Sequence, residues 1–365
     1  MNFWNLLYQA RGLLFGLASA AVFLIFGNVW LHGIGSVPVA LIFFVWLVAA
    51  ILCSAFSVVR QADILAHRLG EPMGTLILTL SITAMEVSMV SAVMLSGPEK
   101  STLARDTMFA VVMIVLAGLT GSALLLGALR HRQQEFNLEG AGSYLSLIIP
   151  LSLLGLVLPN YTVSTAGPTF SASQAFVISA LCIGIYAIFL GIQTIRHREF
   201  FTHRDADVPR GESAKTPLWI PVVLLFVSLV PVVFLSEQLA RVLDFGIHSM
   251  RLPPALAGMV VAGLILAPEG LTGIQAALRN ELQRSVNLLL GSALATIALT
   301  IPAILIVGLI GKREVILGLQ PREIVLLAVT LTISLMTFSR SKTNVLQGAV
   351  HLIVFLFWLL LLVEG

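Results

Sequence analysis

The sequence predicts an all-α, polytopic membrane protein of about eleven transmembrane helices. Of its 365 residues, 58% are hydrophobic and 11% are charged, and the mean hydropathy is +0.99. In ordinary soluble domains, about a quarter of the residues are charged. A bilayer core about 30 Å thick needs roughly 20 apolar residues per helix, and stretches of that length recur along the whole chain. Little polar chain remains between them, which excludes a soluble domain of useful size.

Each apolar stretch predicts one helix. The first follows Arg11, is longer than the apolar part of a signal peptide and offers no clean cleavage site, so we expect it to be retained. The stretch 143–158 is short for a span. The eleven expected spans are 12–31, 37–59, 73–95, 107–129, 143–158, 171–195, 217–235, 254–278, 286–310, 323–338 and 345–363.

A polar, charge-balanced linker at residues 197–216 divides the chain. Apart from the first helix, five expected helices precede the linker and five follow it, and an odd number per unit would turn the second unit upside down relative to the first. A shift of 183 positions superposes Glu86 on Glu269, which supports such a repeat. The expected organisation is one extra N-terminal helix (1–35), a first five-helix repeat (36–196), a cytoplasmic linker (197–216) and a second, inverted five-helix repeat (217–365).

The distribution of Lys and Arg predicts which side of the membrane each loop faces. With the N-terminus inside, the 21 basic residues fall on the cytoplasmic side by two to one. The loop expected at residues 60–68 is one of the cytoplasmic ones. The basic balance therefore orients the chain in a lipid membrane and gives no reason to expect a nucleic-acid partner. The oligomeric state is left open.

Glu86 is the first candidate ion-binding residue, near the middle of its span. Thr79 and Thr83 precede it at helical spacing and fall on the same face. An ionised carboxylate at mid-bilayer costs about 2.5 to 3.5 kcal/mol on insertion scales, so it should face a cavity, a cation or a partner group. The alternative is a protonated Glu86 that joins helices by hydrogen bonds.

Glu269 is the second candidate. It follows Pro268 and precedes Gly270 and Gly273, so we expect this helix to break or kink within the membrane and to offer a surface for close approach. Discontinuous helices at matching positions of two repeats typically mark a transporter site. Both glutamates are therefore expected to bind cations and protons.

The next span adds polar groups to this neighbourhood. Asn287 supplies an amide and Ser292 a hydroxyl, with Gly291 and Thr296 beside them. We expect Asn287 and Ser292 to contribute to the ion site. Helix packing is their alternative role, because Gly, Ser and Thr are enriched at membrane helix interfaces.

Four further residues are candidates for the ion pathway. Asn344 and His351 share one helix face with Gln347, and helix packing is at least an equal alternative for them. His67 and Glu71 lie at the expected cytoplasmic entry of the first repeat. A solvated helix end is the alternative there.

Several motifs add a family resemblance. They are His67-Arg68-Leu69-Gly70-Glu71-Pro72, Glu86-Val87-Ser88, Ala267-Pro268-Glu269-Gly270-Leu271, Gln283-Arg284-Ser285-Val286-Asn287, Gly291-Ser292-Ala293-Leu294-Ala295-Thr296 and Thr343-Asn344-Val345-Leu346-Gln347-Gly348. Together they resemble the ChaA-type calcium/sodium-proton antiporters of the calcium/cation antiporter superfamily. The resemblance implies an eleven-helix exchanger of the bacterial inner membrane in which Glu86 and Glu269 coordinate the ion. The Gly-Asn of many calcium/proton exchangers is replaced by Ile82-Thr83 and Ile265-Leu266, which leaves Ca²⁺, Na⁺ and K⁺ open.

The candidate residues favour transport of a hard cation, because they offer oxygen ligands and little sulfur or imidazole. We expect a secondary active transporter, and not an enzyme, that exchanges cytoplasmic Ca²⁺ or Na⁺, or else K⁺, for protons by alternating access. Protons and cations would occupy the two glutamates in turn. No cofactor is expected beyond the transported ions. The alternatives are a sodium-driven cation exchanger without proton coupling and an intramembrane hydrolase, although HExxH and GxSxG motifs are missing.

Overall fold

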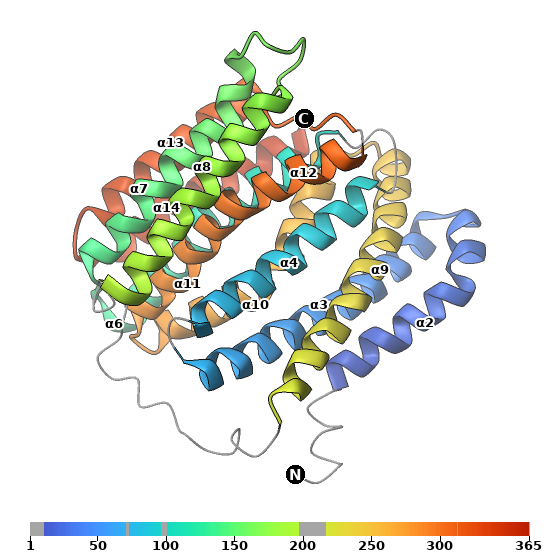
Figure 1. Ribbon diagram of the computed structural model, residues 1–365, viewed down its shortest axis with the longest axis horizontal. Helices are drawn as coiled ribbons and strands as arrows, with labels where there is room; N and C mark the ends of the chain where they lie inside the picture. The colour runs from blue at the N-terminus through green and yellow to red at the C-terminus, as the bar shows by residue number, and fades with distance from the viewer. Residues whose placement is uncertain (1–10, 71–72, 96–100, 197–216, 312, 365) are drawn as a thin grey trace. The chain divides into compact units, whose positions relative to one another are not determined.

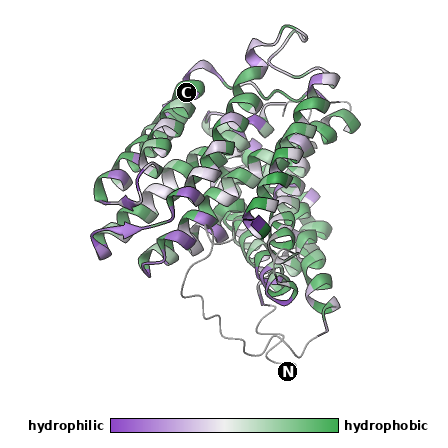
Figure 2. Ribbon diagram, turned by 60° about the vertical axis from the view of Figure 1, so that its left-hand side comes forward, coloured by the Kyte–Doolittle hydropathy of each residue, from purple (hydrophilic) through white to green (hydrophobic). Residues whose placement is uncertain are grey.

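The described chain is almost entirely helical. The computed structural model describes residues 11–70, 73–95, 101–196, 217–311 and 313–364, so Glu71 and the linker at residues 197–216 lie outside the description. Within these residues, eleven helices are long and apolar enough to cross a membrane, which confirms the predicted number of spans. Figure 2 shows hydrophobic residues along the helix bodies and hydrophilic residues gathered toward helix ends and loops.

The elements follow the expected order (Figure 1). Those before the linker are α2 (Arg11–His32), α3 (Val37–Leu69), α4 (Met73–Leu95), α5 (Leu103–Val112), the π-helix η1 (Met113–Leu119), α6 (Thr120–His131), β1 (Gln134–Glu135), α7 (Leu138–Ser152), the π-helix η2 (Leu153–Val157), the 3₁₀ turn η3 (Leu158–Tyr161), α8 (Ala172–Gly191) and the π-helix η4 (Ile192–Arg196). Those after it are α9 (Trp219–Met250), α10 (Ala255–Leu278), α11 (Leu282–Ala295), the π-helix η7 (Thr296–Thr300), α12 (Ile301–Gly311), α13 (Pro321–Phe338), β2 (Lys342–Thr343) and α14 (Val345–Glu364).

Helices α3 and α9 run well beyond the apolar stretches that predicted them. The 33 residues of α3 continue to Leu69, so the loop expected at residues 60–68 is wrong. The 32 residues of α9 continue to Met250, past the expected end of that span. Hydropathy marks only the part of a helix inside hydrocarbon, whereas backbone hydrogen bonds continue through polar residues. Residues with positive φ end both helices, Gly70 at 65° and Arg251 at 53°.

The short stretch at residues 143–158 belongs to a full-length span. It lies within a helical segment of 24 residues, Leu138–Tyr161, which combines α7, η2 and η3. Asn137 caps the start of α7, where its side-chain oxygen accepts a hydrogen bond from the backbone N–H of Gly140 at 3.0 Å. A side-chain cap of this kind satisfies one of the free N–H groups of a first helical turn.

The secondary structure recurs at the predicted repeat shift. Moving α4 by 183 positions gives 256–278, and α10 is Ala255–Leu278. Moving η1 by the same amount gives 296–302, and η7 is Thr296–Thr300. A π-helix is rare and often marks a functional region, so its recurrence is informative. The inverted relation of the two halves stays a prediction.

The described helices form two compact units that are not the two predicted repeats. The first unit combines α2, α3, α4 and α9 with α10 as far as Pro268. The second unit begins at Ser101 in the first half and at Glu269 in the second. Each half therefore gives its first helices to one unit and its last three spans to the other. The linker divides the sequence but not the packing.

Aromatic contacts attach the first helix to the first unit, in which α3 also packs against α4 and α9. The rings of Phe23 and Trp30 on α2 meet those of Phe43 and Trp46 on α3, with centroids 5.3 to 6.3 Å apart. The ring N–H of Trp46 also donates to Ser19 Oγ at 3.0 Å. Aromatic pairs in such edge and stacked arrangements stabilise packing beyond the area they bury.

A short antiparallel ladder joins two loops of the second unit. In it β1 pairs with β2, with Gln134 opposite Thr343. The Lys342 ammonium lies 2.8 Å from Glu135 Oε1, and this carboxylate raises the pKa of Lys342. Beyond the ladder α14 packs against α6 and η1.

Gly348 is required for the close approach of α14 to α6. An added Cβ would lie 2.4 Å from the backbone nitrogen of Leu125, whereas a Cβ on Gly184 of α8 would meet nothing within 4 Å. Gly348→Ala is therefore expected to destabilise the protein by about 1–3 kcal/mol through overpacking. Gly184→Ala is the matched control, and it should be neutral or slightly stabilising because Ala favours helix. Thermal unfolding in detergent measures both, and equal midpoints would contradict the prediction.

Candidate ion-exchange site

Glu86 lies in the middle of α4 and is removed from the surface. Its exposed fraction is 2%, and that of Thr83, one turn earlier, is 7%. Thr79, one further turn earlier, is half-buried. The three residues thus follow one row of α4, at the spacing that the sequence indicated. A carboxylate at this position indicates a functional group, because the membrane makes a buried charge costly.

Glu269 is also buried, with an exposed fraction of 9%. Of the break or kink expected beside it, the break is absent, because α10 runs without interruption from Ala255 to Leu278 with Pro268 inside it. The kink stays a prediction. A proline removes only one backbone donor, and neighbouring groups in a membrane protein can satisfy the carbonyl that loses its partner. Glu269 is therefore presented by a continuous helix.

The two glycines after Glu269 allow close approach, as expected. A Cβ on Gly270 would lie 2.7 Å from Leu119 Cδ2, at the end of η1. A Cβ on Gly273 would lie 3.1 Å from Leu289 Cδ2 on α11. Larger residues at either position would displace these leucines, so the glycines set the packing of α10 around Glu269 within the second unit.

The two glutamates occupy matching places in their halves. Glu86 lies thirteen residues after the start of α4 at Met73, and Glu269 lies fourteen residues after the start of α10 at Ala255. Glu86 belongs to the first compact unit and Glu269 to the second. Each half thus supplies one buried carboxylate, and their pairing in one shared site stays a prediction.

Asn287 and Ser292 are both half-buried on α11. The side-chain oxygen of Asn287 accepts a hydrogen bond from Gln283 Nε2 at 2.9 Å. Beside Ser292, Gly291 faces the ring of Tyr144, which lies 3.6 Å from the position of an added Cβ. The Tyr144 hydroxyl accepts from Gln193 Nε2 at 2.9 Å. Polar groups of α7 and η4 therefore meet beside α11.

His351 is fully buried between helices, which favours packing over a place in an open pathway. Its Nδ1 lies 2.6 Å from the carbonyl oxygen of Leu116 in η1, and its Nε2 lies 3.0 Å from Thr337 Oγ1. A carbonyl can only accept, so Nδ1 carries the proton and a neutral ring accepts at Nε2 from the Thr337 hydroxyl. His351 thereby holds a carbonyl of the π-helix.

Asn344 and His67, the other pathway candidates among the described residues, lie at helix ends. Asn344 is exposed, and its side-chain oxygen accepts from the backbone N–H of Leu346 at 2.9 Å at the start of α14. Gln347 accepts from the backbone N–H of Asn344 at 2.7 Å. His67 is exposed in the last turn of α3, with Nδ1 2.7 Å from the carbonyl oxygen of Asp63. The exposed position of His67 favours its alternative, a solvated helix end. Asn344 is exposed as well and caps the start of α14, which differs from the helix packing named as its alternative.

Comparison with known proteins decides the family. The profile of the sodium/calcium exchanger protein family matches residues 39–195 and 220–363. The chain belongs to this family. The putative ionic transporter y4hA of Sinorhizobium fredii is 42% identical over 312 residues, which are 84% of this chain and 85% of that protein. The sodium-potassium/proton antiporter ChaA of Escherichia coli is 40% identical over 332 residues, which are 89% of this chain and 90% of that protein.

The exchanger family also has solved structures with this fold. The crystal structure of the Ca²⁺/H⁺ antiporter protein YfkE matches with a TM-score of 0.72 at 17% identity, and the match covers 98% of each chain. A likeness at this identity shows the fold alone. It confirms the predicted all-α membrane architecture.

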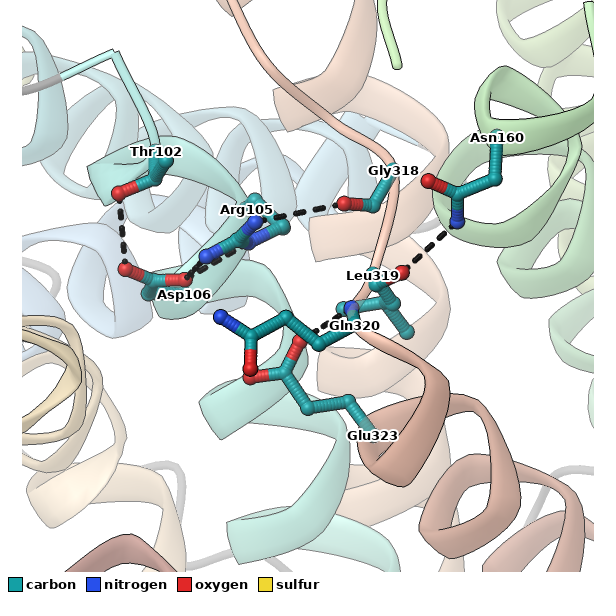
Figure 3. A network of polar contacts seen from close by, with 8 residues as sticks. All are labelled: Thr102, Arg105, Asp106, Asn160, Gly318, Leu319, Gln320 and Glu323. Atoms are coloured by element: carbon teal, nitrogen blue, oxygen red, sulfur yellow. Dashed lines mark hydrogen bonds and ion pairs between the residues drawn. The ribbon is translucent and has the colours of Figure 1, made fainter. Parts of the chain in front are cut away.

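One buried charged cluster of this exchanger was not predicted (Figure 3). Arg105, placed in a loop by the sequence, lies in the first turn of α5 and donates through Nε and Nη2 to Asp106 Oδ1 at 2.8 and 2.7 Å. Its Nη1 lies 3.4 Å from the carbonyl oxygen of Gly318. Thr102 donates to the second oxygen of Asp106 at 3.2 Å. Arg105 and Asp106 are 8% and 7% exposed, so this ion pair is shielded from water.

The same network fixes the chain that leads into α13. Asn160 Nδ2 donates to the carbonyl oxygen of Leu319 at 2.8 Å, and the backbone N–H of Gln320 donates to Glu323 Oε2 at 2.8 Å. Gln320 and Glu323 form a capping box at the start of α13. These bonds join the ends of α5, η3 and α13 within the second unit (Figure 3).

Gln283 is the site residue that sequence reasoning missed. Its spacing of four from Asn287 is the signal in the sequence that could have found it, since residues four apart meet on a helix. Its second partner, Asn137, is 146 residues away and has no sequence signal.

Proposed function

We propose that the chain is a secondary active antiporter that exchanges Na⁺, K⁺ or Ca²⁺ for protons. The observation that carries the proposal is the pair of buried glutamates, Glu86 and Glu269, at matching positions of two halves in a chain of the sodium/calcium exchanger family. Identity of 40% to a sodium-potassium/proton antiporter over nine tenths of the chain supports the proton as the counter-ion.

Competition for the same carboxylates supplies the coupling. An ionised glutamate within the membrane is costly unless a cation or a proton neutralises it. Each carboxylate would therefore either help to coordinate a metal cation or carry a proton. It would do so while access to the site changes from one side of the membrane to the other. Release of one ion then requires uptake of the other. Thr79, Thr83 and Ser292 would add neutral oxygen ligands, which hard cations accept.

The distribution of basic residues supports a membrane orientation with the N-terminus in the cytoplasm. With the N-terminus in the cytoplasm, the basic residues gather on the cytoplasmic side, as the positive-inside rule requires. The proposed location is the bacterial inner membrane, with the cations leaving the cytoplasm as protons enter.

Proton flux in reconstituted vesicles tests the function. The purified protein is placed in liposomes with an imposed inside-acidic pH gradient that a fluorescent amine reports. Addition of NaCl, KCl or CaCl₂ outside should dissipate the gradient, whereas choline chloride should not. Protein-free liposomes with the same additions are the control for leakage.

The same vesicles separate the main alternative. A sodium-driven exchanger without proton coupling would take up labelled calcium into sodium-loaded vesicles as sodium leaves them. It would leave the pH gradient intact. That result would refute proton coupling, and the ion that dissipates the gradient at the lowest concentration identifies the preferred cation.

A further inference from the structure

Two amide side chains and one backbone group form a short relay at the start of α11. The backbone N–H of Asn137, the residue that caps α7, donates to the side-chain oxygen of Gln283. Gln283 in turn donates through Nε2 to the side-chain oxygen of Asn287 at 2.9 Å. Gln283 is 7% exposed, so its own amide has little access to water. The relay ends on a residue of the candidate site.

The backbone N–H at one end decides the orientation of both amides. The oxygen and nitrogen of an amide side chain have nearly the same shape, so only hydrogen bonds distinguish them. The N–H of Asn137 can only donate, and it must therefore face the oxygen of Gln283. The nitrogen of Gln283 then faces Asn287, which must turn its own oxygen toward Gln283. Any reversal would bring two donors face to face at the buried amide of Gln283.

The loop that supplies the backbone donor is itself fixed. Gln134 Nε2 donates to the carbonyl oxygen of Ala277 at 2.8 Å and to the side-chain oxygen of Asn280 at 3.0 Å. His131 Nε2 lies 2.9 Å from the carbonyl oxygen of Leu278. The loop between α6 and α7 is thus bonded to the turn between α10 and α11. The relay has a rigid starting point.

We propose that Gln283 is a positioning residue that makes Asn287 a hydrogen-bond donor in the exchange site, and not an oxygen ligand of the cation. The inference rests on the proposed function and revises the expected role of Asn287. Its Nδ2 is the group turned away from Gln283, so a carboxylate in the site would receive an N–H. Such a bond favours the ionised carboxylate while leaving the cation to other oxygens.

Asn287→Asp tests the role directly. The variant keeps an oxygen toward Gln283 and replaces the outward N–H₂ by a second oxygen. A donor role predicts that cation-driven proton flux falls at least about tenfold, with the KM for the cation unchanged or raised. An oxygen-ligand role predicts the reverse, because a carboxylate is the stronger ligand of a hard cation. Retained flux or a lowered KM would overturn the proposal.

Gln283→Glu is the second variant. Both oxygens of the new carboxylate accept, so Asn287 must rotate its amide and present its oxygen outward. We expect a change of at least about fivefold in the cation KM, whereas a purely structural role would lower stability and leave the KM of the folded protein unchanged. Gln174→Glu is the matched control, since Gln174 also accepts from a backbone N–H, that of Ser171, and donates to a side chain, that of Ser164. Its KM should not move.

A binding measurement separates this inference from the proposed function. Cations that bind the folded protein raise its thermal midpoint, whether or not protons are exchanged. An unchanged or smaller rise in Asn287→Asp supports the donor role, and a larger rise contradicts it. Absence of proton flux in the unchanged protein would refute the antiporter alone.

Discussion

Cation-driven proton flux is expected to fall to the level of empty vesicles in the Glu269→Gln variant. Glutamine has nearly the size of glutamate but cannot bind a transferable proton or balance the charge of a cation. Glu269 is 9% exposed on a continuous helix, and glutamine has nearly the same size. The substitution should therefore leave the packing of Gly270 and Gly273 unchanged. Glu86→Gln should have the same effect, because Glu86 is the matching carboxylate of the first half.

The control for these variants is an acidic residue away from the membrane interior. Glu139 is exposed in the first turn of α7, and Glu139→Gln should exchange ions at the normal rate. All variants are compared at equal amounts of folded protein, measured by size-exclusion chromatography. Normal flux in either Glu86→Gln or Glu269→Gln would remove that residue from the site.

Arg105→Met is expected to be the most destabilising of the charge deletions, by about 3–5 kcal/mol, because removal of one partner strands the other as a buried charge. The side chains of Arg105 and Asp106 are 10% and 6% exposed. Without the guanidinium, Asp106 keeps Thr102 as a donor but loses the only opposite charge that the described contacts give it. The lost bond to Gly318 would also release the chain before α13.

An exposed pair of the same chemistry provides the comparison. Arg241 Nη2 lies 2.8 Å from Glu237 Oε1 on α9, with side chains 37% and 40% exposed. Arg241→Met should cost only about 0.3–0.5 kcal/mol, as is usual for a solvated pair one helical turn apart. Thermal midpoints of both variants in the same detergent measure the difference. Equal shifts would contradict the shielding of the Arg105 pair, and the double variant Arg105→Met/Asp106→Leu should regain part of the loss.

The sequence predicts well those elements whose boundaries coincide with changes in hydropathy. The span at residues 73–95 matches α4, because polar residues or breaks lie at both ends. The ends of α3 and α9 could not be predicted in this way, since their last turns are helical and polar. Pro268 does not break α10, for a different reason. Its effect on a helix depends on what surrounds it, and that is a property of the tertiary structure.

The candidate site shows the same limit. Burial of Glu86 and Glu269 follows from their position within long apolar stretches, and the structure agrees. The bond from Arg105 to Gly318 joins residues 213 positions apart, and the bond from Asn137 to Gln283 joins residues 146 apart. No local pattern encodes such contacts. They become visible only when the helices that carry them are packed together.

The length of α3 has a consequence for His67 and Arg68, which lie in its last turn. A helix of 33 residues is about 50 Å long. At an average tilt of about 20° it spans about 47 Å, more than the roughly 40–45 Å of a bilayer with its headgroups. Since its apolar part, residues 37–59, alone matches the hydrocarbon core, we expect the polar end to reach the level of the lipid phosphates or beyond. His67 is exposed at this end whereas Arg68 is half-buried, so we expect dissolved ions to meet the His67 side chain before they meet the membrane.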